Sequence, residues 1–152
     1  MTEFLDSFAS EMGETTQLHQ PGNLPHAPLS VDAATVPLSG GDDPTYGEVR
    51  WRTLVNGTPE TPREMVFGIA EFGPGDRLMP HRHTPAEVYF GLEGSGIVTI
   101  DGVDHEIRAG VALYVPADAE HGTVAGPDGL RFVYSFASQD FESIVYRFSA
   151  TA

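Results

Sequence analysis

Two histidines and a glutamate lie close together in the stretch GDRLMPHRHTPAEVYFGLEG, at positions 81, 83 and 87. His81 and His83 are two residues apart, so on an extended strand both imidazoles point to the same face. The bend at Thr84-Pro85-Ala86 reverses the chain, and Glu87 begins a second strand. Two imidazoles and a carboxylate aimed into one pocket suit a divalent transition metal ion. His121 follows a later apolar strand and a turn, and we expect it to supply the fourth ligand.

Such a ligand set leaves room for chemistry at the metal. Three imidazoles and one carboxylate leave about two positions open on a six-coordinate ion, where water or a substrate can bind. A structural zinc site is usually closed, four-coordinate and rich in cysteine, and this chain has no cysteine. Fe(II), Mn(II), Ni(II), Co(II) and Zn(II) all accept these ligands, and the residues alone do not choose among them.

Tyr89 lies two residues after Glu87, so strand parity directs its side chain to the same face as the carboxylate. The unperturbed pKa of a phenol is about 10, and a nearby divalent cation lowers it by favouring the phenolate. Tyr89 is therefore a candidate general base. The alternative is a buried aromatic side chain whose hydroxyl only bonds to a neighbour.

The elements that must position these residues are short strands. From Tyr46 onward, apolar and β-branched runs alternate with Gly and Pro, and Asp101-Gly102 between two such runs indicates a hairpin. This pattern predicts an all-β sandwich or barrel over residues 46–152. His105, on the second arm of that hairpin, is expected to be structural.

The first 45 residues differ in composition, and we expect them to pack on the barrel as an N-terminal extension. Residues 2–12 place apolar side chains at helical spacing, which predicts a short amphipathic helix. Residues 14–44 are rich in proline and are expected to be extended, with a short strand around Val31–Leu38. His19 and His26 are expected to be solvated surface residues in this part of the chain.

Composition excludes several classes of function. The 22 acidic and eight basic residues give a formal net charge of −14, which disfavours binding to nucleic acid or to anionic membranes. All eight basic residues are arginine, so Schiff-base chemistry on a lysine is excluded. No apolar run reaches the length of a membrane span. The N-terminus lacks the basic start and apolar core of a signal peptide, and we expect a cytoplasmic protein.

The spacing of these residues resembles the two motifs of the cupin superfamily. The first motif, G-x5-H-x-H-x3-E-x6-G, is filled by Gly75, His81, His83, Glu87 and Gly94. The second, G-x5-P-x-G-x2-H-x3-N, is matched by Gly110, Pro116 and His121, with Asp118 and Ala125 at its second Gly and its Asn places. The resemblance spans roughly residues 64–138. It implies a small antiparallel jelly-roll barrel with the metal inside, and a homodimer.

Within that superfamily, the ligand set and the tyrosine that follows it resemble the cupin-type dimethylsulfoniopropionate (DMSP) lyases of the DddW type. The resemblance implies that the metal, Fe(II) by preference, holds the substrate carboxylate while Tyr89 removes the proton alpha to it. The carbon–sulfur bond then breaks, releasing dimethyl sulfide and acrylate. The sulfonium end of this zwitterion should lie against aromatic faces, for which Trp51, Tyr114, Tyr134 and Tyr146 are candidates.

Two other classes of function use the same ligands. A metal-dependent dioxygenase would place an organic substrate and O₂ at the open positions. A non-catalytic cupin would bind a small acid or sugar, or store a metal, without turnover. A sugar-epimerase-like cupin is a weaker alternative, because such enzymes do not require the complete set of ligands.

Overall fold

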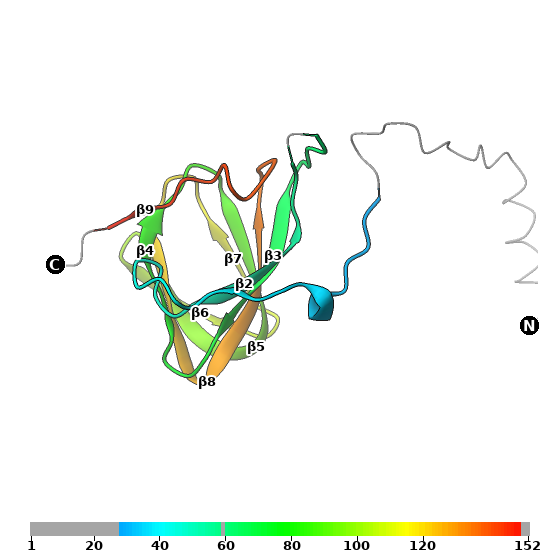
Figure 1. Cartoon of the computed structure of the whole chain (residues 1–152). Helices are drawn as coiled ribbons and strands as arrows, with labels where there is room; N and C mark the ends of the chain where they lie inside the picture. Colours follow the sequence, from blue (N-terminus) through cyan, green and yellow to red (C-terminus); the bar gives the residue numbers. More distant parts are fainter. Residues whose placement is uncertain (1–27, 59, 150–152) are drawn as a thin grey trace, which may run out of the picture.

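One curled, antiparallel β-sheet makes up most of the protein. The structure is a computed structural model that describes residues 28–58 and 60–149. Within these residues, nine strands join in one sheet that wraps into a barrel (Figure 1). Its strands are β1 (Ser39–Gly40), β2 (Arg50–Val55), β3 (Val66–Phe72), β4 (Arg77–Arg82), β5 (Glu87–Ile100), β6 (Val103–Arg108), β7 (Ala112–Val115), β8 (His121–Phe136) and β9 (Arg147–Phe148). The predicted all-β jelly-roll fold is confirmed.

The two longest strands, β5 and β8, hold the barrel together. They pair from Glu87 opposite Phe136 to Ile100 opposite His121, and β8 also pairs with both β3 and β4. The β5–β8 register shifts on both sides of Gly94, and such bulges bend a strand. Gly94 has φ +69°, and a Cβ there would lie 2.1 Å from the carbonyl oxygen of Gly129. The last glycine of the first motif is therefore required by the close approach of two backbones.

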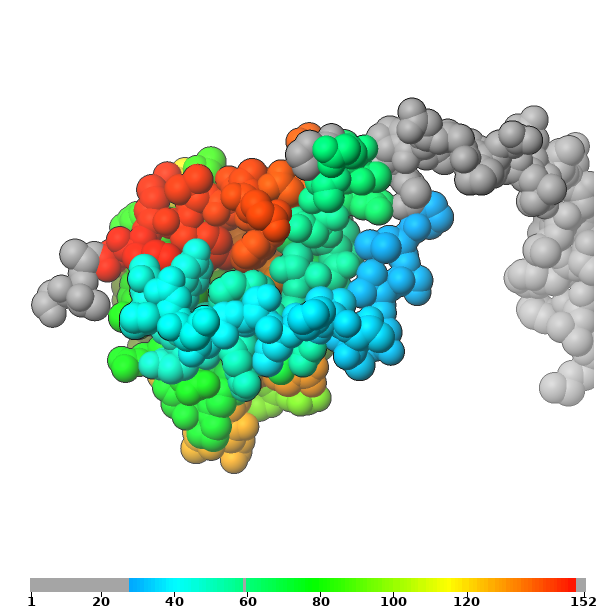
Figure 2. All heavy atoms as spheres, viewed as in Figure 1, coloured from blue at the N-terminus to red at the C-terminus, as the bar shows by residue number. Residues whose placement is uncertain are grey.

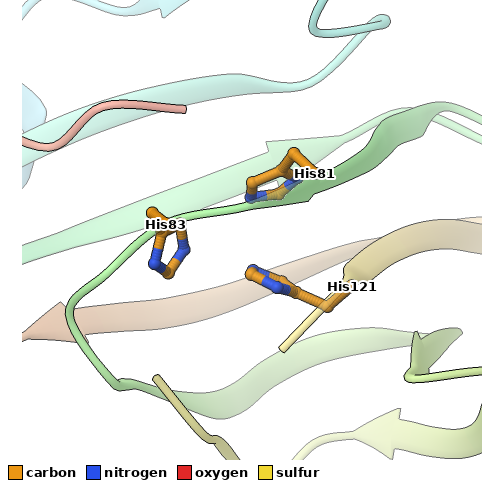
Figure 3. Close-up of side chains that lie close together, drawn as sticks. All are labelled: His81, His83 and His121. Atoms are coloured by element: carbon orange, nitrogen blue, oxygen red, sulfur yellow. The ribbon is translucent and has the colours of Figure 1, made fainter. Parts of the chain in front are cut away.

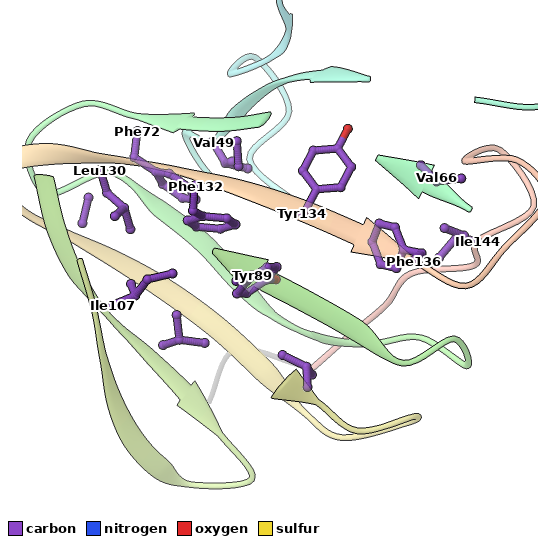
Figure 4. Close-up of a cluster of buried hydrophobic side chains, with 14 of the residues drawn as sticks. Val49, Val66, Phe72, Tyr89, Ile107, Leu130, Phe132, Tyr134, Phe136 and Ile144 are labelled. Atoms are coloured by element: carbon purple, nitrogen blue, oxygen red, sulfur yellow. The ribbon is translucent and has the colours of Figure 1, made fainter. Parts of the chain in front are cut away.

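Alternating side chains of the strands fill the barrel (Figure 4). Along the first half of β5, Glu87 and Tyr89 face inward whereas Val88 and Phe90 face outward, as the period of two predicts. The apolar core lies on β3, β5, β6, β7 and β8, with Val66, Phe72, Val98, Ile107, Val115, Leu130, Phe132 and Phe136 almost fully buried. The interior also contains buried polar side chains, which form the site described below.

The hairpin at Asp101-Gly102 is confirmed. Ile100 pairs with Val103, and both turn residues have positive φ, 46° and 81°, as a two-residue turn between β5 and β6 requires. His105 lies on β6 opposite Val98.

The strand expected around Val31–Leu38 is wrong. This segment contains a 3-10 turn, Ala33–Thr35, because the side chain of Asp32 accepts a hydrogen bond from the amide of Ala34 and caps the turn. The first strand, β1, begins only at Ser39 and pairs with β2.

The helix expected at residues 2–12, and His19 and His26, lie outside the described residues. The division of the chain at residue 45 stays a prediction. Among the residues that the structure does describe, no helix is long and apolar enough to cross a membrane.

Ile107 provides a test of the barrel core. It is 0% exposed on β6, so Ile107→Ala should lower the free energy of unfolding by about 2–5 kcal/mol through lost burial and a cavity. Ile97→Ala is the matched control, because Ile97 is 40% exposed and its loss should cost about 0.5 kcal/mol or less. Urea unfolding of both variants measures the difference, and equal costs would contradict this account of the core.

Candidate metal centre

The four predicted ligands meet at one end of the barrel interior. His81 is near the end of β4, His83 follows that strand, and Glu87 and His121 are the first residues of β5 and β8. His81 lies opposite His121 in the pairing of β4 with β8. All three imidazoles are 1% exposed, and each offers one nitrogen to a group whose members lie within 4.8 Å of one another (Figure 3).

The three histidines share one pattern of hydrogen bonding that fixes their tautomers. Nδ1 of His81 lies 2.8 Å from the backbone oxygen of Met79, Nδ1 of His83 2.9 Å from that of Pro85, and Nδ1 of His121 3.0 Å from that of Ala119. A carbonyl oxygen only accepts, so each Nδ1 carries the proton and donates it. When the ring is neutral, each Nε2 then has a lone pair, which is the form of histidine that binds metals.

These lone pairs face a carboxylate. Oε2 of Glu87 lies 3.2 Å from Nε2 of His83 and 3.2 Å from Nε2 of His121. Within the described residues, Nε2 of His121 is buried without a hydrogen-bond partner of acceptable geometry. Acceptors that point at one another in a buried site are unfavourable unless a cation lies between them. The donor set therefore fits a divalent metal ion.

A proton is a poor substitute for that ion at His81. Burial, followed by repulsion from His121, lowers the pKa of His81 from 6.5 to about 3. Burial opposes ionisation of Glu87, but the adjacent His121 and His83 outweigh this and hold the pKa of its carboxyl below the usual value. The site thus combines a neutral imidazole at His81 with a carboxylate at Glu87, and both forms suit binding of a divalent cation.

Tyr89 lies beside this cluster, on the face that strand parity predicts. It is 1% exposed, its ring centroid is 6.2 Å from that of His121, and it packs against Phe132 at 4.2 Å. Burial, then the negative charge of Glu87, raises the pKa of Tyr89 well above its ordinary value. The protein's own residues thus favour the neutral phenol, in the opposite direction to the effect expected of a metal ion.

An aromatic pocket opens next to Glu87 and Tyr89. Its free volume is about 30 Å³, and it is open to solvent on one side. Among the described residues that line it, Glu87 is the single charged side chain, and seven are aromatic: Tyr46, Trp51, Tyr89, Phe132, Tyr134, Phe141 and Tyr146. A pocket of this kind suits a small ligand with one anionic end, for the metal, and one cationic or apolar end.

Three of the four aromatic residues expected to face the sulfonium line this pocket, namely Trp51, Tyr134 and Tyr146. Tyr146 also stacks on His81, with ring centroids 4.7 Å apart and an interplanar angle of 23°. The expectation for Tyr114 is wrong: it is 65% exposed, because on β7 it pairs with the outward-facing Val88. Tyr46, Phe132 and Phe141 were missed. Tyr46 and Phe141 lie outside the strands, so no periodicity marks their direction.

The two departures from the second cupin motif leave the site intact. Asp118 has φ +59°, the left-handed conformation for which glycine is usual, and its amide donates to the carbonyl of His83 at 3.0 Å. Its carboxylate forms an ion pair with Arg147 in β9. Ala125 is buried on β8, where it pairs with Gly96. Neither substitution changes the position of His121 at the start of β8.

Comparisons with known proteins agree with this geometry. Residues 68–135 match the cupin domain family. The protein named dimethylsulfoniopropionate lyase DddW, from Ruegeria pomeroyi, is 74% identical over 152 residues, which cover all of both chains. The crystal structure of the polyketide cyclase RemF from Streptomyces resistomycificus has a TM-score of 0.69 at 24% identity, covering 83% of this chain and 88% of RemF.

A structure from a study of the DMSP lyases RdDddP and RnDddQII has a TM-score of 0.57 at 20% identity, covering 68% of this chain and 53% of that one. At these identities the two structural likenesses establish the fold alone.

The low pKa of His81 makes the stability of the metal-free protein depend on pH. Between pH 6.5 and about 3 the unfolded chain binds this proton and the folded protein does not. The free energy of unfolding should therefore fall as the pH decreases through this window, by up to about 1.4 kcal/mol per pH unit for one group.

Urea unfolding of the metal-free protein at several pH values between 7.5 and 4.5 measures this slope. His81→Gln removes the titrating group and should flatten the slope more than His105→Gln, which removes a histidine outside the cluster. A wild-type stability that does not change over this range would contradict the prediction.

Proposed function

The chain belongs to the cupin family and, within it, to the dimethylsulfoniopropionate lyases of the DddW type, and from this premise we propose how its residues carry out the reaction. The protein is a carbon–sulfur lyase that splits DMSP into dimethyl sulfide and acrylate. His81, His83, Glu87 and His121 bind the divalent metal ion, and Tyr89 is the general base. The observation that carries this proposal is the convergence of the three imidazoles within 4.8 Å of one another, with Glu87 3.2 Å from Nε2 of both His83 and His121. Tyr89 lies on the same inward face as Glu87.

The metal ion, when bound, supplies Lewis-acid chemistry: it withdraws charge from the substrate carboxylate and makes the adjacent C–H more acidic. We propose Fe(II), the metal that the resemblance to the DddW type favours. The three nitrogen ligands and one oxygen ligand also accept Mn(II), Ni(II), Co(II) or Zn(II).

Tyr89 takes the proton from the carbon alpha to the carboxylate. The electron pair of that C–H bond becomes the carbon–carbon double bond of acrylate, and the carbon–sulfur bond breaks with its electrons going to sulfur. The leaving group departs as neutral dimethyl sulfide, so it needs no acid. One base is therefore enough, and no oxidant or reductant is consumed.

The aromatic lining of the pocket receives the sulfonium end of the substrate. Cationic groups are attracted to the faces of Trp and Tyr rings, and the attraction strengthens when water is excluded. Trp51, Tyr134 and Tyr146 line the pocket beside Glu87. A zwitterion held in this way has its carboxylate at the metal and its alpha carbon beside Tyr89.

We also propose that the protein is cytoplasmic and forms a homodimer. Val88, Phe90 and Tyr114 are exposed on neighbouring outward positions of β5 and β7, where a second copy could cover them. The net charge of −14 disfavours nucleic acids and anionic membranes as partners.

Tyr89→Phe should keep the metal and lose most of the turnover. Loss of a general base typically lowers the rate by about 10²–10⁴-fold, whereas the four ligands are unchanged. Headspace gas chromatography measures dimethyl sulfide, and elemental analysis measures bound metal. Tyr114→Phe is the matched control and should behave like the wild type, because Tyr114 lies on the outer face of the barrel. A fully active Tyr89→Phe variant would show that another group is the base.

Metal dependence separates the lyase from the two alternatives. Protein loaded anaerobically with Fe(II) should release dimethyl sulfide from DMSP without O₂, and a chelated sample or His121→Ala should not. Uptake of O₂ with an organic substrate would favour a dioxygenase. If the protein bound DMSP but released no dimethyl sulfide with any one of the five metals, a non-catalytic cupin would be favoured.

A further inference from the structure

Asn56 is a polar side chain that the reaction does not use, yet it joins two distant parts of the chain. It follows the last residue of β2, and its Oδ1 accepts a hydrogen bond of 2.7 Å from the amide of Phe141. Its Nδ2 donates to both carboxylate oxygens of Glu142, at 3.1 and 3.3 Å. One carboxamide thus holds two consecutive residues near the C-terminus.

Gly57 completes this contact. A Cβ at this position would lie 2.0 Å from the backbone oxygen of Gln139 and 2.8 Å from the backbone nitrogen of Arg63. The backbone around residue 139 therefore packs directly on Gly57, at a distance that only glycine permits. Asn56 and Gly57 together form a seat for residues 139–142.

The seated residues belong to a segment, residues 137–149, that we call the C-terminal segment. It runs along one end of the barrel, in orange to red (Figures 1 and 2). At its far end β9 pairs with β4, with Phe148 opposite the metal ligand His81. Between the seat and β9 it contributes two side chains to the pocket, Phe141 and Tyr146.

Phe141 is the pocket residue closest to the seat. Its ring lies 6.2 Å from Trp51, 6.0 Å from Tyr134 and 6.2 Å from Tyr146, measured between ring centroids. It thus forms part of the aromatic wall, where it also packs against Phe136 of β8, and its backbone amide is held by Asn56. Ile144, which is buried, follows within the same turn.

We propose that Asn56 is a positioning residue for this lyase: it holds the C-terminal segment in the conformation in which Phe141 forms part of the wall that receives the cationic end of the substrate. This inference rests on the function proposed above. When the segment is released, the protein still binds its metal but presents an incomplete pocket. The smaller the fraction of molecules whose C-terminal segment is seated, the weaker the apparent substrate affinity. Substrate that has bound reacts at the normal rate.

The seat requires an acceptor and a donor on one side chain. Asp at position 56 would still accept from the amide of Phe141, but it would place a second carboxylate about 3 Å from Glu142, where two like charges repel. Gln at position 142 would restore the pairing, because its amide can donate to Asp at 56. The side chain at position 142 would then donate and the side chain at position 56 would accept, which is the reverse of the wild-type hydrogen bond.

Four variants test the proposal by this exchange: Asn56→Ala, Asn56→Asp, Glu142→Gln and the double variant Asn56→Asp/Glu142→Gln. With Fe(II)-loaded protein and DMSP, Asn56→Ala should raise KM about tenfold and change kcat less than about twofold, as expected for loss of one or two hydrogen bonds that act before binding. Asn56→Asp should raise KM, Glu142→Gln should match the wild type, and the double variant should return KM towards the wild-type value.

The fluorescence of Trp51, the single tryptophan of the chain, gives a readout that does not depend on turnover. Release of Phe141 should make Trp51 more accessible to quenching by acrylamide in Asn56→Ala and Asn56→Asp, and less so in the double variant. Bound metal should be equal in all of them.

The possible outcomes separate the inference from the function on which it rests. A wild-type protein that releases no dimethyl sulfide would overturn the proposed function, and the quenching series would still report on the seat. An active wild type whose Asn56→Ala variant has normal KM and normal quenching would overturn the role of Asn56. If Asn56→Ala lowered both kcat and the free energy of unfolding, and the double variant restored neither, Asn56 would only support the fold.

Discussion

The central constraint on this structure is the burial of three imidazoles and a carboxylate among apolar side chains. Three imidazole nitrogens and a carboxylate converge at one end of the barrel, and the backbone has used the other nitrogen of each ring as a donor. In this arrangement the remaining nitrogens point at one another and at Glu87, and all four residues are almost fully buried. A divalent cation between these atoms would replace the unfavourable contacts between acceptors with favourable ones. By excluding solvent from the cluster, the barrel therefore favours binding of the ion. Burial that would be costly for an ordinary polar cluster here favours metal binding.

Much of the site could be predicted because strand geometry has a period of two and the ligands lie at strand ends. The spacing of His81 and His83 and the parity of Glu87 and Tyr89 translate directly into one inward face. Strand alternation shows which residues share a face, but not whether that face lies inside the barrel. Tyr114 illustrates this limit, because it lies on the outer face of β7. The pKa of Tyr89 also depends on burial, which spacing does not report.

The parts that the sequence did not predict lie in irregular segments. Tyr46 and Phe141 precede and follow strands, and their directions depend on contacts that are distant in the chain, such as the bond from Asn56 to the amide of Phe141. The turn at residues 33–35 depends on a single cap by Asp32 that outweighs the extended tendency of its neighbours. In each case hydrogen bonds outside the strand pairing fix the local conformation, and no periodic pattern accompanies them.

Part of the aromatic pocket lining comes from residues outside the cupin domain match. The four proposed ligands and Tyr89 all lie within residues 68–135, which match the cupin domain family. The pocket residues Tyr46, Trp51, Phe141 and Tyr146 lie outside that range. The reactive centre and much of the surface that selects the substrate are thus encoded in separate stretches of the gene. Exchange of the flanking stretches can change what the barrel accepts while its chemistry is inherited unaltered.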